Sequence, residues 1–245
     1  MNAQPDPFAC VHSVVSSGFL HIGNSTVPIA QPGDTVDFGT LSPPSTSNLA
    51  VITPTNGQVF GGPAQTVPGG LLGLLGMGSS SSAVSASFEL AGATTPSTDL
   101  DPTATTVYFN DTNAVFQSGT ILNLPVKIQL HNPLLGPSCT LGSNSNPIML
   151  SLQDGTTSPP PPNQPISGVA GSLSILDGGN VLGLTGSTFV DNSFGVPGAS
   201  GCGIGGSLDR AINSKENVPS RPGRNAAVLN LGSELAVTCF AEGTC

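Results

Sequence analysis

Glycine and proline interrupt this chain so often that it has little room for helices. The 245 residues include 32 Gly and 23 Pro, and both residue types destabilise the interior of a helix. Only the segment from Ser207 to Asn217 keeps an apolar face at helical spacing, and Pro219 follows it closely. The chain is therefore expected to consist mainly of short strands.

The segments between these interruptions alternate apolar and polar residues, which is the pattern of half-buried strands. The clearest is Ile121–His131, in which every second residue from Leu122 to Leu130 is aliphatic. Pro125 within it predicts an edge strand or a bulge. Further strands are expected at 10–22, 83–90, 170–176 and 181–184, a tight turn at 177–180, and a closing hairpin of 226–231 and 234–240 around Gly232-Ser233.

About a dozen such strands predict an all-β protein with a β-sandwich or jelly-roll-like architecture and long loops rich in Gly, Pro and Ser. We expect residues 1–245 to form a single domain. A run of four prolines lies within residues 158–165 and predicts an extended polyproline II spacer. If the chain has a boundary between two units, this run is where we expect it.

The composition argues against disorder, which is the main alternative for a chain so rich in Gly and Pro. Hydrophobic residues make up 37% of the sequence and charged residues only 8%, whereas disordered chains are usually apolar-poor and highly charged. The net charge of −9 comes with only five basic residues. Such a chain is poorly suited to bind nucleic acid or an anionic membrane.

Five widely spaced cysteines favour structural disulfides formed in an oxidising compartment. Spacing alone does not fix which cysteines pair. Our preferred arrangement has two disulfides: Cys139–Cys202 joins two Gly/Ser/Pro-rich loops, and Cys10–Cys239 ties the first strand region to the last. Cys245 is then the spare thiol, free or bonded to another chain.

The start of the sequence is polar, and we interpret it as a mature exported chain whose signal peptide has been removed. The longest apolar run, from Leu71 to Met77, is far shorter than the ~20 residues that a membrane-spanning helix requires. We expect a protein that is secreted or lies at the cell surface.

The most recognisable sequence motifs lie between His131 and Cys202. They read HNPLLGPSC at 131–139, GSNSNPI at 142–148, GTTS before the proline run, VDNSF at 190–194 and GCG at 201–203. This stretch resembles a group of uncharacterised secreted proteins from actinobacteria, most clearly over the middle third of the chain. The resemblance implies export, a paired Cys139 and Cys202, and a setting in the cell envelope or outside the cell, but no activity.

No catalytic motif stands out. A Ser-His-Asp hydrolase would need one of the three histidines, His12, His21 or His131, but the G-x-S-x-G elbow of many such enzymes is missing. A glycosidase would need paired carboxylates, usually beside aromatic rings that stack on sugars. The chain has no Trp and one Tyr. We therefore expect structural or surface histidines, no cofactor, and no enzymatic activity.

Two features of the sequence are candidates for binding. Asp99, Asp101 and Asp111 are weak calcium candidates, because they offer hard oxygen ligands in turns, yet the EF-hand loop pattern is absent and turn capping explains them equally well. A leucine-rich segment is either an exposed patch for a partner or ligand, or a loop tucked into the core. Its apolar members are Leu71, Leu72, Leu74, Leu75 and Met77.

The leading hypothesis is an exported, non-enzymatic structural, adhesive or assembly protein, with self-association or other envelope proteins as partners. Its low charge and Ser/Thr/Asn/Gly-rich surface suit subunits that pack together and resist proteolysis. The alternative is an extracellular module that binds an apolar small molecule, a lipid or a glycan, with residues 63–82 as a lid. A second alternative is a secreted hydrolase with an unfamiliar site.

Overall fold

A computed structural model describes residues 9–29, 34–41, 49–54, 58–76, 82–91, 108–110, 113–114 and 118–236. The expected all-β class is confirmed. The strands are β1 Ala9–Ile22, β2 Ser25–Ile29, β3 Thr35–Leu41, β4 Leu49–Ile52, β5 Phe60–Gly61, β6 Gln65–Val67, β7 Val84–Leu90, β8 Tyr108–Phe109, β9 Thr120–His131, β10 Thr140–Leu141, β11 Ile148–Gln153, β12 Ser172–Leu176, β13 Val181–Asp191, β14 Ala199–Ser200 and β15 Ala226–Ala236. The helices are α1 Gly70–Leu74 and α3 Asp209–Glu216, with short 3-10 turns η1 Asp177–Gly179 and η2 Ile204–Gly206.

All the described strands belong to one antiparallel sheet that curls round on itself. Its main path runs β11-β13-β15-β1-β3-β4-β8-β9, and β11 also pairs with β9, so the path returns to its start. The closing contact between β11 and β13 is short, with Gln153 opposite Val190. It is reinforced by Ser151, whose backbone N–H donates to Asp191 Oδ2 at 2.7 Å.

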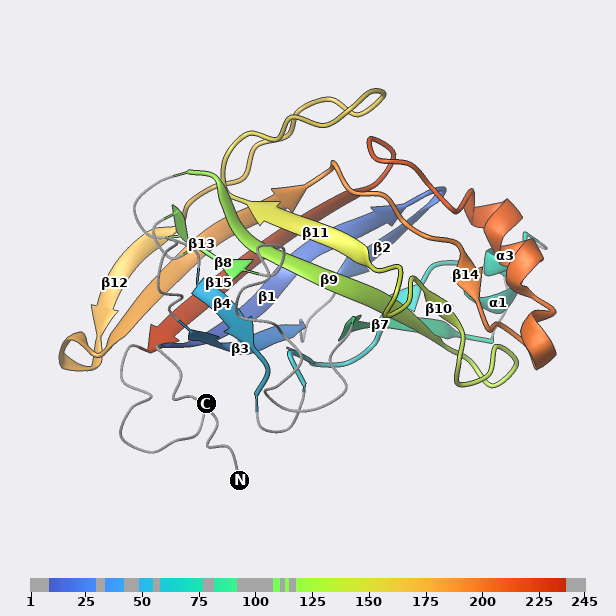
Figure 1. The fold of residues 1–245 in the computed structure, drawn as a ribbon, viewed down its shortest axis with the longest axis horizontal. Coiled ribbons are helices and arrows are strands. Elements are labelled where there is room, and N and C mark those ends of the chain that lie inside the picture. Colours follow the sequence, from blue (N-terminus) through green and yellow to red (C-terminus); the bar gives the residue numbers. More distant parts are fainter. Residues whose placement is uncertain are drawn as a thin grey trace.

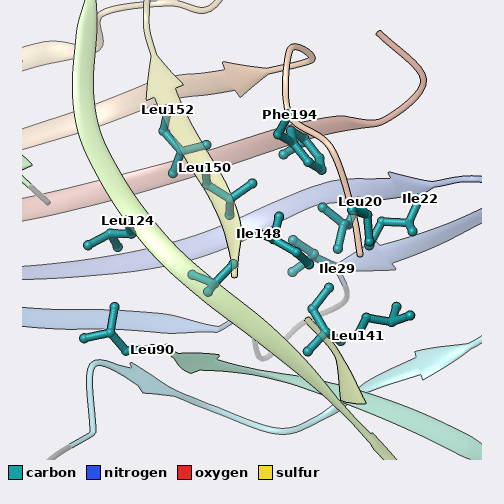
Figure 2. Close-up of a cluster of buried hydrophobic side chains, with 14 of the residues drawn as sticks. Leu20, Ile22, Ile29, Leu90, Leu124, Leu141, Ile148, Leu150, Leu152 and Phe194 are labelled. Carbon is teal, nitrogen blue, oxygen red and sulfur yellow. The ribbon is translucent and has the colours of Figure 1, made fainter. Parts of the chain in front are cut away.

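The curled sheet forms two layers with the core between them. In Figure 1, β9 and β11 lie in front of β15, β1 and β2. Figure 2 shows buried aliphatic side chains of β9 and β11 between these front strands and the strands behind, among them Leu124, Ile148 and Leu150. Leu20 and Ile29, from β1 and β2, meet them from the other side. The two-layer core expected from the sequence is thus built by one continuous sheet.

Strand β9 follows the predicted alternation, with Leu122, Leu124 and Val126 all buried. The prediction that Pro125 marks an edge strand or a bulge is wrong in one respect, because β9 pairs on both sides. Proline is tolerated there because its partner on one side changes: Val126 pairs with Leu90 of β7, whereas Asn123 pairs with Tyr108 of β8.

The predicted hairpin around Gly232-Ser233 does not form. Residues Ala226–Ala236 make one uninterrupted strand, β15. Its neighbours explain why: Gly232 lies opposite Val14 of β1, and Ser233 lies opposite Leu184 of β13. A central strand that pairs along both sides has no reason to turn at a glycine. The expected turn at 177–180 does join β12 to β13.

The disulfide Cys139–Cys202 is confirmed, and both cysteines are fully buried. It is the one disulfide described within the ranges given above, where two were expected. Cys10 lies on β1 and has no free thiol. Cys239 and Cys245 fall outside the described residues, so the Cys10–Cys239 pairing and the role of Cys245 stay predictions.

Helices α1 and α3 lie together at one end of the sheet (Figure 1). The predicted helix at Ser207–Asn217 is confirmed as α3, and the turn between β1 and β2 holds its C-terminal end. The backbone N–H of Asn24 donates to the carbonyl of Glu216 at 3.0 Å, and Asn24 Nδ2 donates to the carbonyl of Lys215 at 2.7 Å. Gly23 has φ +56°, and a Cβ there would lie 1.8 Å from the Glu216 carbonyl oxygen. Glycine is therefore required at this turn.

The proline run at 158–165 lies between β11 and β12, and both of these strands pair with β13. The single-domain organisation stays a prediction. Among the described residues, no helix combines the length and the apolar character needed to span a membrane.

Candidate functional site

Apolar cavities follow one another through the interior between the two layers. The end cavity, beside α1 and α3, has a volume of about 60 Å³. The middle cavity measures about 40 Å³ and shares Leu20, Ile29 and Phe88 with the end cavity. The far cavity, about 30 Å³, shares Leu122 with the middle cavity. A lining of aliphatic and aromatic side chains with few polar groups is typical of sites for apolar ligands, although each volume is smaller than the roughly 300 Å³ of a typical ligand pocket.

The end cavity is built from both layers and from both helices. Its walls come from β1, β2, β6, β7, β9 and β10, and Leu74 of α1 and Ile212 of α3 close its end. Alternation along each strand aims one set of side chains inward. Figure 2 shows how Leu20, Ile29 and Leu141 from three of these strands approach one another. The cavity is therefore a consequence of how the helices cover the end of the sheet.

The wall of the end cavity contains a seam between β2 and β6. These strands lie close together, but in the described part of the chain no backbone hydrogen bond joins them, because β2 pairs with β1 and β6 with β7. Val27 of β2 and Val67 of β6 both line the cavity. A seam without ladder hydrogen bonds separates at lower cost than a paired strand edge.

Besides the serines Ser13, Ser25, Ser87 and Ser233, three larger polar side chains interrupt the apolar lining. Gln65 lines the end cavity and Asp34 lines the middle one, and Gln65 Nε2 donates to Asp34 Oδ1 at 3.3 Å. Burial raises the pKa of the Asp34 carboxyl above its ordinary value of 3.8, and the hydrogen bond from Gln65 opposes that rise. The third group is Glu216, which lines the end cavity and is 5% exposed.

The three histidines do not build a catalytic triad within the described residues. His12 Nδ1 forms a hydrogen bond with Asp37 Oδ1. His21 Nδ1 is 2.8 Å from Thr26 Oγ1, and His131 Nε2 is 2.7 Å from Ser87 Oγ. The Ser87–His131 pair is exposed, and no described carboxylate bonds to His131. These contacts are cross-strand pairs on the surface.

The acidic residues are equally dispersed. Glu89 forms an ion pair with Lys127 at 3.1 Å, and Asp191 accepts hydrogen bonds from the backbone and hydroxyl of Ser193. The calcium candidates Asp99, Asp101 and Asp111 lie outside the described residues. Within the ranges that the structure describes, no group of three or more His, Cys, Asp and Glu side chains is arranged to hold a metal ion.

The leucine-rich segment contributes to the interior. Leu71 and Leu74 of α1 are buried, and Leu75 is partly buried against the same core. Leu74 lines the end cavity. Met77 and the side chain of Leu72 are outside the described residues. The described leucines of this segment therefore cover the end of the cavity instead of forming an exposed patch.

Sequence reasoning missed Glu216 and the Asp34–Gln65 pair as lining residues. One signal was available for Glu216: it ends the only helix that the sequence predicted, and an acidic residue is unfavourable at a helix C-terminus. Nothing in the local sequence around Asp34 and Gln65 brings them together, because they are 31 residues apart and meet only through tertiary structure.

Comparison of the chain with family models, curated proteins and solved structures found no match.

Proposed function

We propose that the chain is an exported, non-catalytic binding protein that holds an apolar small molecule or lipid tail between the two layers of its sheet. The succession of apolar cavities along the interior supports this most directly, since neighbouring cavities share lining side chains. An elongated apolar ligand would displace no well-bonded water from such walls. Export is supported by the buried disulfide Cys139–Cys202.

The ligand would enter through the seam between β2 and β6. Opening it breaks no backbone hydrogen bond of the described residues, whereas separating two paired strands would break a ladder. The short helix α1 follows β6 and carries Leu74 on the cavity wall. Movement of β6 with α1 would therefore widen the entrance and the cavity together.

The test is an equilibrium titration with a neutral dye that fluoresces in apolar surroundings. Ala86 of β7 lines the end cavity, so Ala86→Leu would fill part of the space and should weaken dye binding about ten-fold or more, as expected for lost apolar burial. Ala226 of β15 is a matched control, being a half-buried strand alanine that is not among the residues lining the three cavities. Equal binding by wild type and Ala86→Leu would contradict the proposal.

Self-assembly is a second candidate function, and β12 is the observation that favours it. This strand pairs only with β13 among the described strands, and it lies at an outer edge of the sheet (Figure 1). Leu173, Ile175 and Leu176 on it are exposed, with Ile175 at 70%. Exposed apolar edge strands are templates for pairing with another chain.

A charged substitution on the exposed edge of β12 tests whether this strand is an assembly interface. Ile175→Lys should convert an associating species to monomer in sedimentation velocity if β12 is the interface. Ile204→Lys is the matched control, because Ile204 is 97% exposed but lies in η2, away from any strand edge. A wild-type chain that stays monomeric at high concentration would exclude this second candidate.

A further inference from the structure

Glu216 is a buried acid in an apolar cavity. Its side chain is 7% exposed, and it lines the end cavity. Oε1 lies 4.0 Å from Lys215 Nζ, which is too long for a hydrogen bond. Oε2 is fully buried and has no hydrogen-bond partner among the described residues.

This arrangement is unfavourable in the protein alone. A buried carboxylate oxygen without a donor loses its hydration and gains nothing in return. The position adds to the cost, since Glu216 is the last residue of α3, and the C-terminal end of a helix repels negative charge. Helix packing does not require an acid there, because the hydrogen bond to Asn24 uses the backbone carbonyl of Glu216.

A ligand that carries a donor would satisfy this oxygen. Apart from Ser25, Gln65 and Ser87, the remaining lining of the cavity is apolar, and it includes Ile212, one turn earlier on α3, and Leu74 of α1. A molecule suited to such a site has an apolar body and one cationic donor group, which makes a charge-assisted hydrogen bond to a carboxylate. An anionic head group would meet a like charge.

We propose that the end cavity binds an amphiphile with a primary amine, whose ammonium group donates to Glu216 Oε2 while its alkyl part lies among the aliphatic side chains. This inference rests on the proposed function and gives it a ligand class. It also assigns the head group to the α3 end of the cavity, with the tail directed toward the middle cavity through the shared residues Leu20, Ile29 and Phe88.

Calorimetric titrations with octylamine, octanol and octanoate test it, because the three probes share an alkyl chain and differ in the head group. Wild type should bind octylamine at least about ten-fold more tightly than octanoate. Glu216→Gln should lower octylamine affinity about ten-fold and leave octanol binding within two-fold, because the amide keeps an acceptor but not the charge. Glu234→Gln removes the same charge from an exposed position on β15 and should behave as wild type.

The outcomes separate the two proposals. If octanol binds to wild type but Glu216→Gln binds octylamine unchanged, the role of Glu216 is overturned and the apolar site stands. If none of the three probes binds to wild type, both fall. A measurement on wild type alone covers the case of a variant that does not fold: nuclear Overhauser contacts should join the Ile212 methyl groups to the octylamine carbon beside nitrogen. Contacts from Ile212 to the terminal methyl of the probe instead would overturn the orientation.

Discussion

Removing the disulfide Cys139–Cys202 should destabilise the protein chiefly through its unfolded state. The bond closes a loop with a sequence separation of 63 residues, which contains the strands from β10 to β14. In the chain-entropy model, closing such a loop removes about 14 cal/mol/K of entropy from the unfolded chain, or about 4 kcal/mol at 25 °C.

The backbones of both cysteines make hydrogen bonds that do not involve their sulfur atoms. The carbonyl of Cys139 accepts from the N–H of Leu130 at 2.9 Å, and the N–H of Cys202 donates to Asp209 Oδ1 at 2.7 Å. These contacts survive replacement of either cysteine by alanine. Loss of a buried sulfur adds about 1 kcal/mol of packing for each site.

Single and double variants separate the two contributions in urea unfolding. Cys139→Ala alone breaks the bond, so it should lose about 5 kcal/mol, and Cys139→Ala with Cys202→Ala should lose only about 1 kcal/mol more. The midpoint of thermal unfolding should fall by roughly 10 °C or more. If the single variant loses less than about 2 kcal/mol, and the double variant about twice as much as the single, packing alone accounts for the effect and the loop-closure reasoning is refuted.

Three further substitutions probe the end of the sheet and the cavity lining, each measured by urea unfolding. Gly23→Ala should lose more stability than Gly178→Ala, which costs about 1–2 kcal/mol, since both glycines have positive φ but only a Cβ at 23 would meet a backbone oxygen; equal losses would contradict the close approach. Asn225→Ala should lose about 3 kcal/mol, because its fully buried amide accepts from Gly23 N–H and Ser220 Oγ and donates to the Phe194 carbonyl; a loss under about 1 kcal/mol would not fit. Asp34→Asn should be more stable than wild type at pH 7: burial raises the folded pKa, so wild type loses stability as pH rises from 3.8 through the folded pKa. The gap should close at low pH, and a gap independent of pH would contradict buried ionisation as its cause.

Much of the architecture could be read from local patterns, because alternation and turn residues act over a few positions. The alternation in β9 predicted the buried aliphatic residues from Leu122 to Leu130 but not the burial of Ile121 and Gln129, and the helix at 209–216 was the one segment with helical spacing. The Cys139–Cys202 pair was also predicted. Strand pairing across the sheet was not, since nothing local specifies that β11 pairs with both β9 and β13. The same limit produced the wrong hairpin at Gly232, whose strand is held straight by β1 and β13.

The candidate site was the least predictable part for the same physical reason. Its lining comes from eight elements spread from β1 to α3, so no window of sequence contains it. The sequence singled out the leucine-rich segment around Leu74, and Leu74 does line the end cavity. Its role in closing the end cavity depends on α3, which comes more than a hundred residues later in the chain. A buried, unpaired carboxylate such as that of Glu216 is visible only once burial is known.

The most direct test of an apolar binding site between the two layers is a methyl NMR titration of the wild-type chain with octanol. Saturable shifts are predicted for methyl groups that line the end and middle cavities, with Leu20, Ile29 and Leu74 as reporters. Ile204, which is 97% exposed, should not respond. Shifts that fail to saturate, or that appear at Ile204 and not at Leu20, would contradict the account.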